Sequence, residues 1–191
     1  CLRVGNTSLL KGIGMKSALL VVDVQNGVFG SAQPPYQSEA VIRNINALVE
    51  YANAHSLKTV LIQHQIPGML EPESPAWQLY SGLAAAKQGI TVRKQTPDSF
   101  FGTDLAERLA QEGVEHLIVC GYSTEFCIDR TVFSAASRGY KVTLADDAYT
   151  THDKPHLDAR TIIAHHSFTL SKHPNIELTA TAALVAEQKP A

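Results

Sequence analysis

ALLVVDV, residues 18–24, is a nearly continuous apolar run in which Asp23 is the single charged residue. An apolar run of this length is typical of a strand that helices cover on both faces, as in a parallel sheet. An ionised carboxylate inside such a strand is costly unless it is paired, so Asp23 requires a compensating partner. This stretch therefore predicts a buried strand with a polar site at its carboxyl end.

The rest of the chain alternates short β-branched runs with longer amphipathic ones. Further strands are predicted at 58–63, 90–94, 115–121 and 141–147, with a short sixth strand at 167–170. Helices are predicted at 39–54, at 125–138 and at 155–166, and one more is predicted from a cap at Thr103 or Asp104 to residue 111. The segment 66–89 is predicted to be mostly loop, and the tail from 176 is weakly helical. Strands that alternate with helices imply right-handed crossovers. The predicted fold class is α/β, with a doubly wound, mainly parallel six-stranded sheet and helices on both faces.

The size and charge of the chain limit its function class. Its 191 residues, 45% hydrophobic and 18% charged, suit one domain with a sizeable core, predicted at 15–187. The formal net charge is -2 with scattered basic residues, which argues against a nucleic-acid-binding face. No run reaches the roughly 18 apolar residues of a membrane span. Residues 1–14 contain no signal-peptide core and are interpreted as a leader or tag outside the domain.

The three cysteines, Cys1, Cys120 and Cys127, are too few for a disulfide framework, and no Cys-x-x-Cys pair indicates a zinc site. A reducing cytoplasm is the predicted location. Cys120 lies inside the apolar run of the strand at 115–121 and is interpreted as a core residue. Cys127 follows that strand near the start of a predicted helix, and it is the cysteine that we consider for chemistry.

Three chemically compatible side chains follow predicted strands. Asp23 ends the first strand, Lys94 ends the strand at 90–94, and Cys127 follows the strand at 115–121. In an open parallel sheet, functional sites form beyond the carboxyl ends of the strands. The sequence therefore predicts that these three side chains share one site.

Each of the three has a functional and a structural interpretation. Cys127 could react as a thiolate, with its pKa lowered by a helix N-terminus, or could be a small core residue. Asp23 could accept the thiol proton as a general base, or could bind loop amides. Lys94 could hold the carboxylate and thiolate ionised, or could be a solvated lysine. Their common position at strand ends favours the functional interpretation.

The blocks that contain these residues resemble the isochorismatase-like cysteine hydrolases, the family of nicotinamidases, N-carbamoylsarcosine amidase and streptothricin hydrolase. The matching segments are ALLVVDVQNGVF (18–29), VLIQH (60–64), VRKQTPDSFFGTDL (92–105), VCGYSTEFCIDRTVFSAASRGYKV (119–142) and DDA (146–148). They span nearly the whole chain from Met15 to about residue 170. The order of the Asp-x-Gln, Lys…Ser-Phe-x-Gly-Thr-x-Leu and Gly-x-x-Thr-x-x-Cys blocks makes the resemblance specific.

The resemblance implies that Asp23 is the base, Lys94 the orienting cation and Cys127 the nucleophile. It also implies a cis peptide bond at Tyr122–Ser123, which would aim the N–H groups of Ser123 and Cys127 at one point as an oxyanion hole. The implied reaction is hydrolysis of a C–N bond in a small amide, lactam or ureide through a thioester. Relatives require no cofactor for this reaction and are commonly dimers or tetramers, so a homo-oligomer with a small-molecule substrate is expected.

One departure from the family pattern concerns metal binding. Nicotinamidases carry Asp-x-His after the second strand, whereas this chain has Gln63-His64-Gln65 there. The missing aspartate places both the metal and nicotinamide as a substrate in doubt. His64, Phe29, Trp77 and Tyr122 are candidates for the pocket wall, with ordinary packing as the alternative for each.

Two other functions stay open at this point. One is hydrolysis of an isochorismate-like vinyl ether with Asp23 as the acid; the presence of Cys127 argues against it, because isochorismatases of that type lack the nucleophilic cysteine. The other is a non-catalytic binding or redox-responsive protein in which Cys127 is oxidised. His165 and His166 are predicted to lie on a helix remote from the strand ends.

Overall fold

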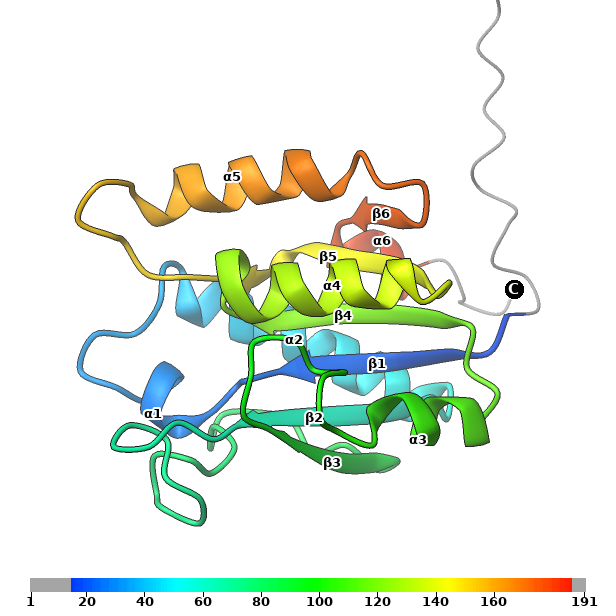
Figure 1. Ribbon diagram of the computed structural model, residues 1–191, viewed down its shortest axis with the longest axis horizontal. Helices are drawn as coiled ribbons and strands as arrows, with labels where there is room; N and C mark the ends of the chain where they lie inside the picture. Colours follow the sequence, from blue (N-terminus) through cyan, green and yellow to red (C-terminus); the bar gives the residue numbers. More distant parts are fainter. Residues whose placement is uncertain (1–14, 187–191) are drawn as a thin grey trace, which may run out of the picture.

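The structure, a computed structural model, describes residues 15–186. One sheet lies between two layers of helices (Figure 1), which confirms the predicted α/β fold class. The predicted leader at 1–14 lies outside the described residues, and the predicted domain limits stay predictions.

The sheet has six strands, and every neighbouring pair is parallel. The strands are β1 (Ser17–Val22), β2 (Lys58–His64), β3 (Gly89–Lys94), β4 (His116–Tyr122), β5 (Lys141–Thr150) and β6 (Ile176–Thr179). Their order is β3-β2-β1-β4-β5-β6. The chain winds outward from β1 in one direction and from β4 in the other. Ligands of such sheets bind beyond the carboxyl ends of the strands at this switch point.

Helices cover both faces of the sheet. They are α1 (Asn26–Phe29), α2 (Ser38–Ala54), α3 (Leu105–Gln111), the π-helix η1 (Thr124–Ile128), α4 (Asp129–Ser137), α5 (Ala159–Leu170) and α6 (Thr181–Ala186). In Figure 1, α3 and α4 lie in front of the sheet, α5 lies above α4 at the top of the view, and α2 and α6 lie behind the sheet. Among the described helices, none is long and apolar enough to cross a bilayer.

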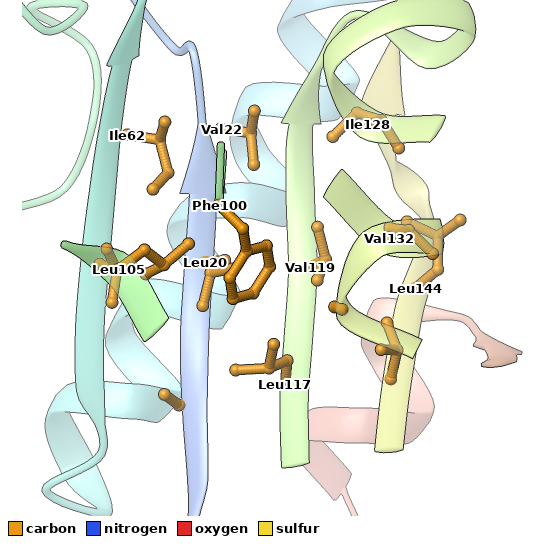
Figure 2. Packing of buried hydrophobic residues seen from close by; sticks show 14 of the residues in the cluster. Leu20, Val22, Ile62, Phe100, Leu105, Leu117, Val119, Ile128, Val132 and Leu144 are labelled. Carbon is orange, nitrogen blue, oxygen red and sulfur yellow. The ribbon is translucent and has the colours of Figure 1, made fainter. Parts of the chain in front are cut away.

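Each face of the sheet has its own core because successive side chains of a buried strand point to opposite faces. On the face of α3 and α4, Leu20 and Val22 of β1 pack with Val132 and other apolar residues (Figure 2). On the opposite face, Leu19 and Val21 pack against the apolar stripe of α2. The continuous apolar run of β1 is therefore explained by burial on both sides.

The prediction of the sixth strand is wrong in position. Residues 167–170 form the last turn of α5, and the sixth strand is Ile176–Thr179, within the tail that was predicted to be weakly helical. A short run such as SFTL fits either a strand or a helix by composition. The helix forms because Asp158 caps it, with its Oδ1 accepting a hydrogen bond from the Thr161 N–H at 2.7 Å, and Leu170 is buried in the core.

Gly121 allows β1 and β4 to approach closely near the switch point. Its φ is +126°, a conformation that side-chain-bearing residues rarely adopt, and a Cβ atom there would lie 2.1 Å from the Val22 carbonyl oxygen. The register between β4 and β5 also shifts between Val119 and Gly121. The glycine thus lets the segment before Cys127 leave β4 next to the end of β1.

Candidate active site

The structure brings together the three predicted catalytic residues at the carboxyl ends of the strands. Lys94 Nζ lies 2.9 Å from Asp23 Oδ2 and 3.0 Å from Cys127 Sγ. All three are buried, with exposed fractions of 2% for Asp23, 1% for Lys94 and 5% for Cys127. An ammonium in contact with a carboxylate and a sulfur is therefore held out of water inside the fold.

Asp23 has an unusual backbone conformation, with a φ of +53°. Residues other than glycine rarely adopt such a φ, and when they do they are often found at functional sites. Its Oδ2 pairs with the Lys94 ammonium at 2.9 Å, and its Oδ1 has no hydrogen-bond partner by geometry among the described residues. Oδ1 therefore has a free lone pair within the buried cluster.

The ammonium of Lys94 has more neighbours than hydrogens. Besides Asp23 and Cys127, it lies 3.1 Å from the Thr96 carbonyl oxygen, 3.4 Å from the Pro97 carbonyl oxygen and 3.3 Å from His64 Nδ1. A buried charge requires such partners because removal from water is costly. Lys94 is thus a compensated internal cation rather than a solvated surface lysine.

Cys127 lies in η1, whose π-helical turn is closed by a bond from the Ile128 N–H to the Ser123 carbonyl oxygen at 3.0 Å. The sequence predicts one helix over 125–138, but the structure divides it into η1 and α4. Single π-helical turns are frequent at functional sites. Here the turn sets the position of the sulfur relative to β4.

Burial raises the pKa of the Cys127 thiol. Its pKa is raised to about 12, chiefly by burial and also by the Asp23 carboxylate, whereas Lys94 opposes the increase. The prediction of a pKa lowered by a helix N-terminus is wrong in direction, because burial outweighs the other effects. The thiolate consequently requires a base within the site.

His64 belongs to the same cluster. It ends β2, directly beside Lys94 in the sheet register, and its Nδ1 lies 3.5 Å from Cys127 Sγ and 3.6 Å from Asp23 Oδ2. The sequence assigns it only to the pocket wall. Functional sites form beyond the carboxyl ends of parallel strands, and this rule, which singles out Asp23 and Lys94, also applies to His64 at the end of β2. The same rule could have predicted from the sequence that His64 belongs to the site.

Gln25 is a structural part of the site that sequence reasoning missed. Its Oε1 accepts a hydrogen bond from the His64 N–H at 2.9 Å, and its Nε2 donates to the carbonyl oxygens of His64 at 3.1 Å and Trp77 at 2.8 Å. Both backbone groups of His64 are therefore bound by one buried amide. Gln25 is the glutamine of the Asp-x-Gln block, so that block is the sequence signal for these hydrogen bonds to His64.

Asp23, His64 and Cys127 offer three potential metal-ligand atoms within 4.8 Å of one another. Lys94 Nζ, however, lies within 3.3 Å of an atom of each of them. An ammonium therefore already supplies the positive charge at this point, and a cation bound by the same three atoms would be repelled by it. The residues present do not fit a metal ion while Lys94 holds this position.

The peptide bond between Tyr122 and Ser123 is cis, and Ser123 is buried. The Tyr122 ring contacts Phe29 edge-on, with ring centroids 6.2 Å apart, and its hydroxyl lies 2.8 Å from His152 Nδ1. The pKa of Tyr122 is raised to about 12, chiefly by burial. Tyr122 and Phe29 thus pack against each other beside the end of β4.

Trp77 is buried. Its ring lies under the Arg93 guanidinium, 4.7 Å from that group, and lines a cavity of about 760 Å³ beside the edge strand β3. Its carbonyl oxygen accepts hydrogen bonds from Gln25 and Gln63. Trp77 therefore contacts the site through its backbone, whereas its ring lines the outer cavity.

The prediction that His165 and His166 are remote from the strand ends is wrong. Both line a second cavity of about 470 Å³ that Ser123 also lines. His166 Nδ1 lies 3.0 Å from Asp129 Oδ1. The reason is that α5 packs against η1, which follows β4 directly.

Comparison with known proteins assigns the chain to a known family. Residues 17–168 match the family model described as the isochorismatase domain. An isochorismatase family protein of Bacillus subtilis (strain 168), YddQ, is 31% identical over 142 residues, which cover 72% of this chain and 79% of that protein.

A streptothricin hydrolase of Streptomyces noursei is 34% identical over 140 residues, which cover 72% of this chain and 56% of the hydrolase. The match thus spans little more than half of that relative's length. The crystal structure of an isochorismatase family protein superposes with a TM-score of 0.81 at 28% identity, covering 86% of this chain and 98% of that one.

Proposed function

The chain belongs to the isochorismatase family of hydrolases, and we propose that it is a cysteine-dependent member that hydrolyses a C–N bond in a small amide, lactam or ureide. The observation that carries this proposal is the contact of one buried ammonium, Lys94 Nζ, with both the Asp23 carboxylate and the Cys127 sulfur. A nucleophile, a base and a group that orients them are the parts that covalent acyl transfer requires.

In the first half of the reaction, the thiol proton passes to Asp23 and the Cys127 sulfur attacks the substrate carbonyl carbon. The carbonyl oxygen then carries a negative charge, and the N–H groups of Ser123 and Cys127 are the proposed donors to it. When the tetrahedral intermediate collapses, the C–N bond breaks. The leaving nitrogen takes the proton from Asp23, and a thioester remains on Cys127.

In the second half, water replaces the amine. Asp23, again ionised, takes a proton from water, and the resulting hydroxide adds to the thioester carbon. The C–S bond breaks, the carboxylic product leaves, and the proton returns to the sulfur. The unpartnered Oδ1 of Asp23 supports this role, because it has a lone pair available for these protons.

A panel of small amides, lactams and ureides tests the proposal through the release of ammonia or amine. We expect Cys127→Ala to lower kcat/KM by about three orders of magnitude or more, because it removes the nucleophile. Mass spectrometry should detect an acyl adduct on Cys127 in the wild-type protein. Cys120→Ala is the matched control, since Cys120 is buried in the core on the α2 face of the sheet.

The same variant separates the proposal from the two other functions. Near wild-type hydrolysis of the panel by Cys127→Ala would contradict the thioester. Hydrolysis of a vinyl ether, added to the panel, by both the wild type and Cys127→Ala would support vinyl-ether hydrolysis with Asp23 as the acid. Absence of any acyl adduct and any turnover across the panel would support a binding or redox-responsive protein.

A further inference from the structure

We propose that His64 is a further catalytic residue, a second base that takes the thiol proton from Cys127 and passes it to Asp23. This inference rests on the proposed function above, because it concerns the same sulfur and the same carboxylate. It adds a proton carrier to the three residues that the resemblance to the family implies.

The position of His64 is defined by the order of the strands. At the carboxyl edge of the sheet, β2 lies between β3 and β1, so His64 lies between Lys94 and Asp23. The Gln25 amide binds both the N–H and the carbonyl oxygen of His64, which fixes the backbone from which the ring projects. His64 is buried, with an exposed fraction of 9%. The ring is therefore held in place in the cluster.

The three N–H groups of the Lys94 ammonium can all be donated to acceptors other than His64, which leaves the lone pair of His64 Nδ1 free. An ammonium donates three hydrogen bonds and accepts none. The three shortest contacts of Lys94 Nζ are Asp23 Oδ2 at 2.9 Å, Cys127 Sγ at 3.0 Å and the Thr96 carbonyl oxygen at 3.1 Å. When these three are donated, Nδ1 of His64 remains as an acceptor for the thiol hydrogen, with Sγ 3.5 Å away.

An imidazole suits this step better than a carboxylate that is paired with an ammonium. A general base is most effective when its pKa lies near the working pH, and unperturbed imidazole is close to that point. Asp23 Oδ2 is already paired with the Lys94 ammonium. The S–H bond breaks with its electron pair left on sulfur, and the proton binds the Nδ1 lone pair.

The proton then moves from His64 to the Asp23 carboxylate, whose Oδ2 is 3.6 Å from Nδ1, and from there to the leaving nitrogen. Asp23, Lys94 and Cys127 are the ionisable groups that contact His64, and the charge of Cys127 also acts on Tyr122. With the proton on His64, the cluster holds an imidazolium, an ammonium, a carboxylate and a thiolate. Its net charge is unchanged, so no uncompensated charge is created in the buried site.

Alkylation of Cys127 by iodoacetamide tests the proposal without any substrate. The rate is measured from pH 5 to 10 by peptide mass spectrometry, which distinguishes Cys127 from the other cysteines. We expect His64→Asn to lower the rate at pH 7 by about tenfold or more, because the thiolate fraction falls tenfold for each increase of one in the apparent thiol pKa. The difference between the two rates should narrow toward pH 10, because hydroxide increasingly removes the proton.

The Asn variant also tests for a purely structural role. Its amide oxygen can accept a hydrogen bond near the position of Nδ1, but it cannot carry the proton. A His64→Asn rate within twofold of wild type at every pH overturns the proposal. His55→Asn is the matched control, since His55 is exposed beyond the end of α2, and we expect no change in its alkylation profile.

If His64→Asn does not fold, nitrogen NMR of the histidine rings gives a second measurement. We expect His64 to titrate at a different pH in the wild type and in Cys127→Ser, because a thiolate and an imidazolium stabilise each other. Identical titrations overturn the proposal. If the wild-type protein hydrolyses no member of the panel but its alkylation profile depends on His64, the proposed function alone is refuted. If the wild-type protein hydrolyses amides but His64→Asn leaves the alkylation profile unchanged, the role of His64 alone is refuted.

Discussion

Lys94 places a buried ammonium between the Asp23 carboxylate and the Cys127 sulfur. A charge in this position stabilises the fold only through its partners, because its own desolvation is costly. Removal of one partner therefore leaves the other charge uncompensated in the interior. At the scale of the residue, stability and chemistry depend on the same contacts.

We expect Lys94→Met to lower the free energy of unfolding by about 3–5 kcal/mol, because it leaves the Asp23 carboxylate buried without its cation. Urea denaturation measures the change. The double variant Asp23→Asn/Lys94→Met should recover most of the stability but none of the activity, since it removes both charges. Lys87→Met, at an exposed lysine, is the control; a Lys94→Met variant as stable as this control would contradict the prediction.

At the scale of the elements, the approach of β1 to β4 decides where the cluster forms. Gly121 lets the two backbones come close, and η1 then begins two residues after β4 ends. The Gln25 amide links the end of β1 to the end of β2 in the same way. Three strand ends are thus held by the close approach at Gly121 and by the Gln25 side-chain amide, neither of which uses the side chains of Asp23, His64 or Cys127.

We expect Gly121→Ala to lower the free energy of unfolding by about 3 kcal/mol or more, because the new Cβ meets the backbone of Val22 and the φ is strained. Gly113→Ala separates the two causes. Gly113 also has a positive φ, +65°, but nothing lies within 4 Å of a Cβ there, so a cost of only about 1 kcal/mol is expected. Equal costs by urea denaturation would show that the close approach has no effect.

At the scale of the whole molecule, the winding of the sheet places four polar side chains at one edge. Asp23, His64 and Lys94 follow or end three neighbouring strands, and Cys127 follows the fourth. The buried core on each face of the sheet is apolar. The predicted cytoplasmic location stays a prediction.

The predicted homo-oligomer is also a property of the whole molecule. We expect light scattering coupled to size-exclusion chromatography to give the mass of a dimer or a tetramer of the 20.7 kDa chain. A mass of one chain over the whole accessible concentration range would refute this expectation. The measurement requires no substrate and is independent of the proposed chemistry.

The local pattern of the sequence determined the elements and most of the chemistry. Apolar runs and helical stripes predicted five of the six strands because hydrophobic periodicity is a short-range property. The rule that parallel strands end at one edge then brought Asp23, Lys94 and Cys127 together. The prediction of a strand at 167–170 failed because the composition of this run suits both a helix and a strand. Only the cap at Asp158 and the packing of Leu170 favour the helix.

The tertiary structure alone decided the order of the strands, and through it the place of His64 between Lys94 and Asp23. It also decided the acidity of Cys127, since a thiol pKa depends on burial and on charges that are distant in sequence. ALLVVDV, read alone, required a partner for Asp23 without identifying it. Lys94, 71 positions later in the chain, became that partner because strand pairing is set by packing between distant segments and not by local composition.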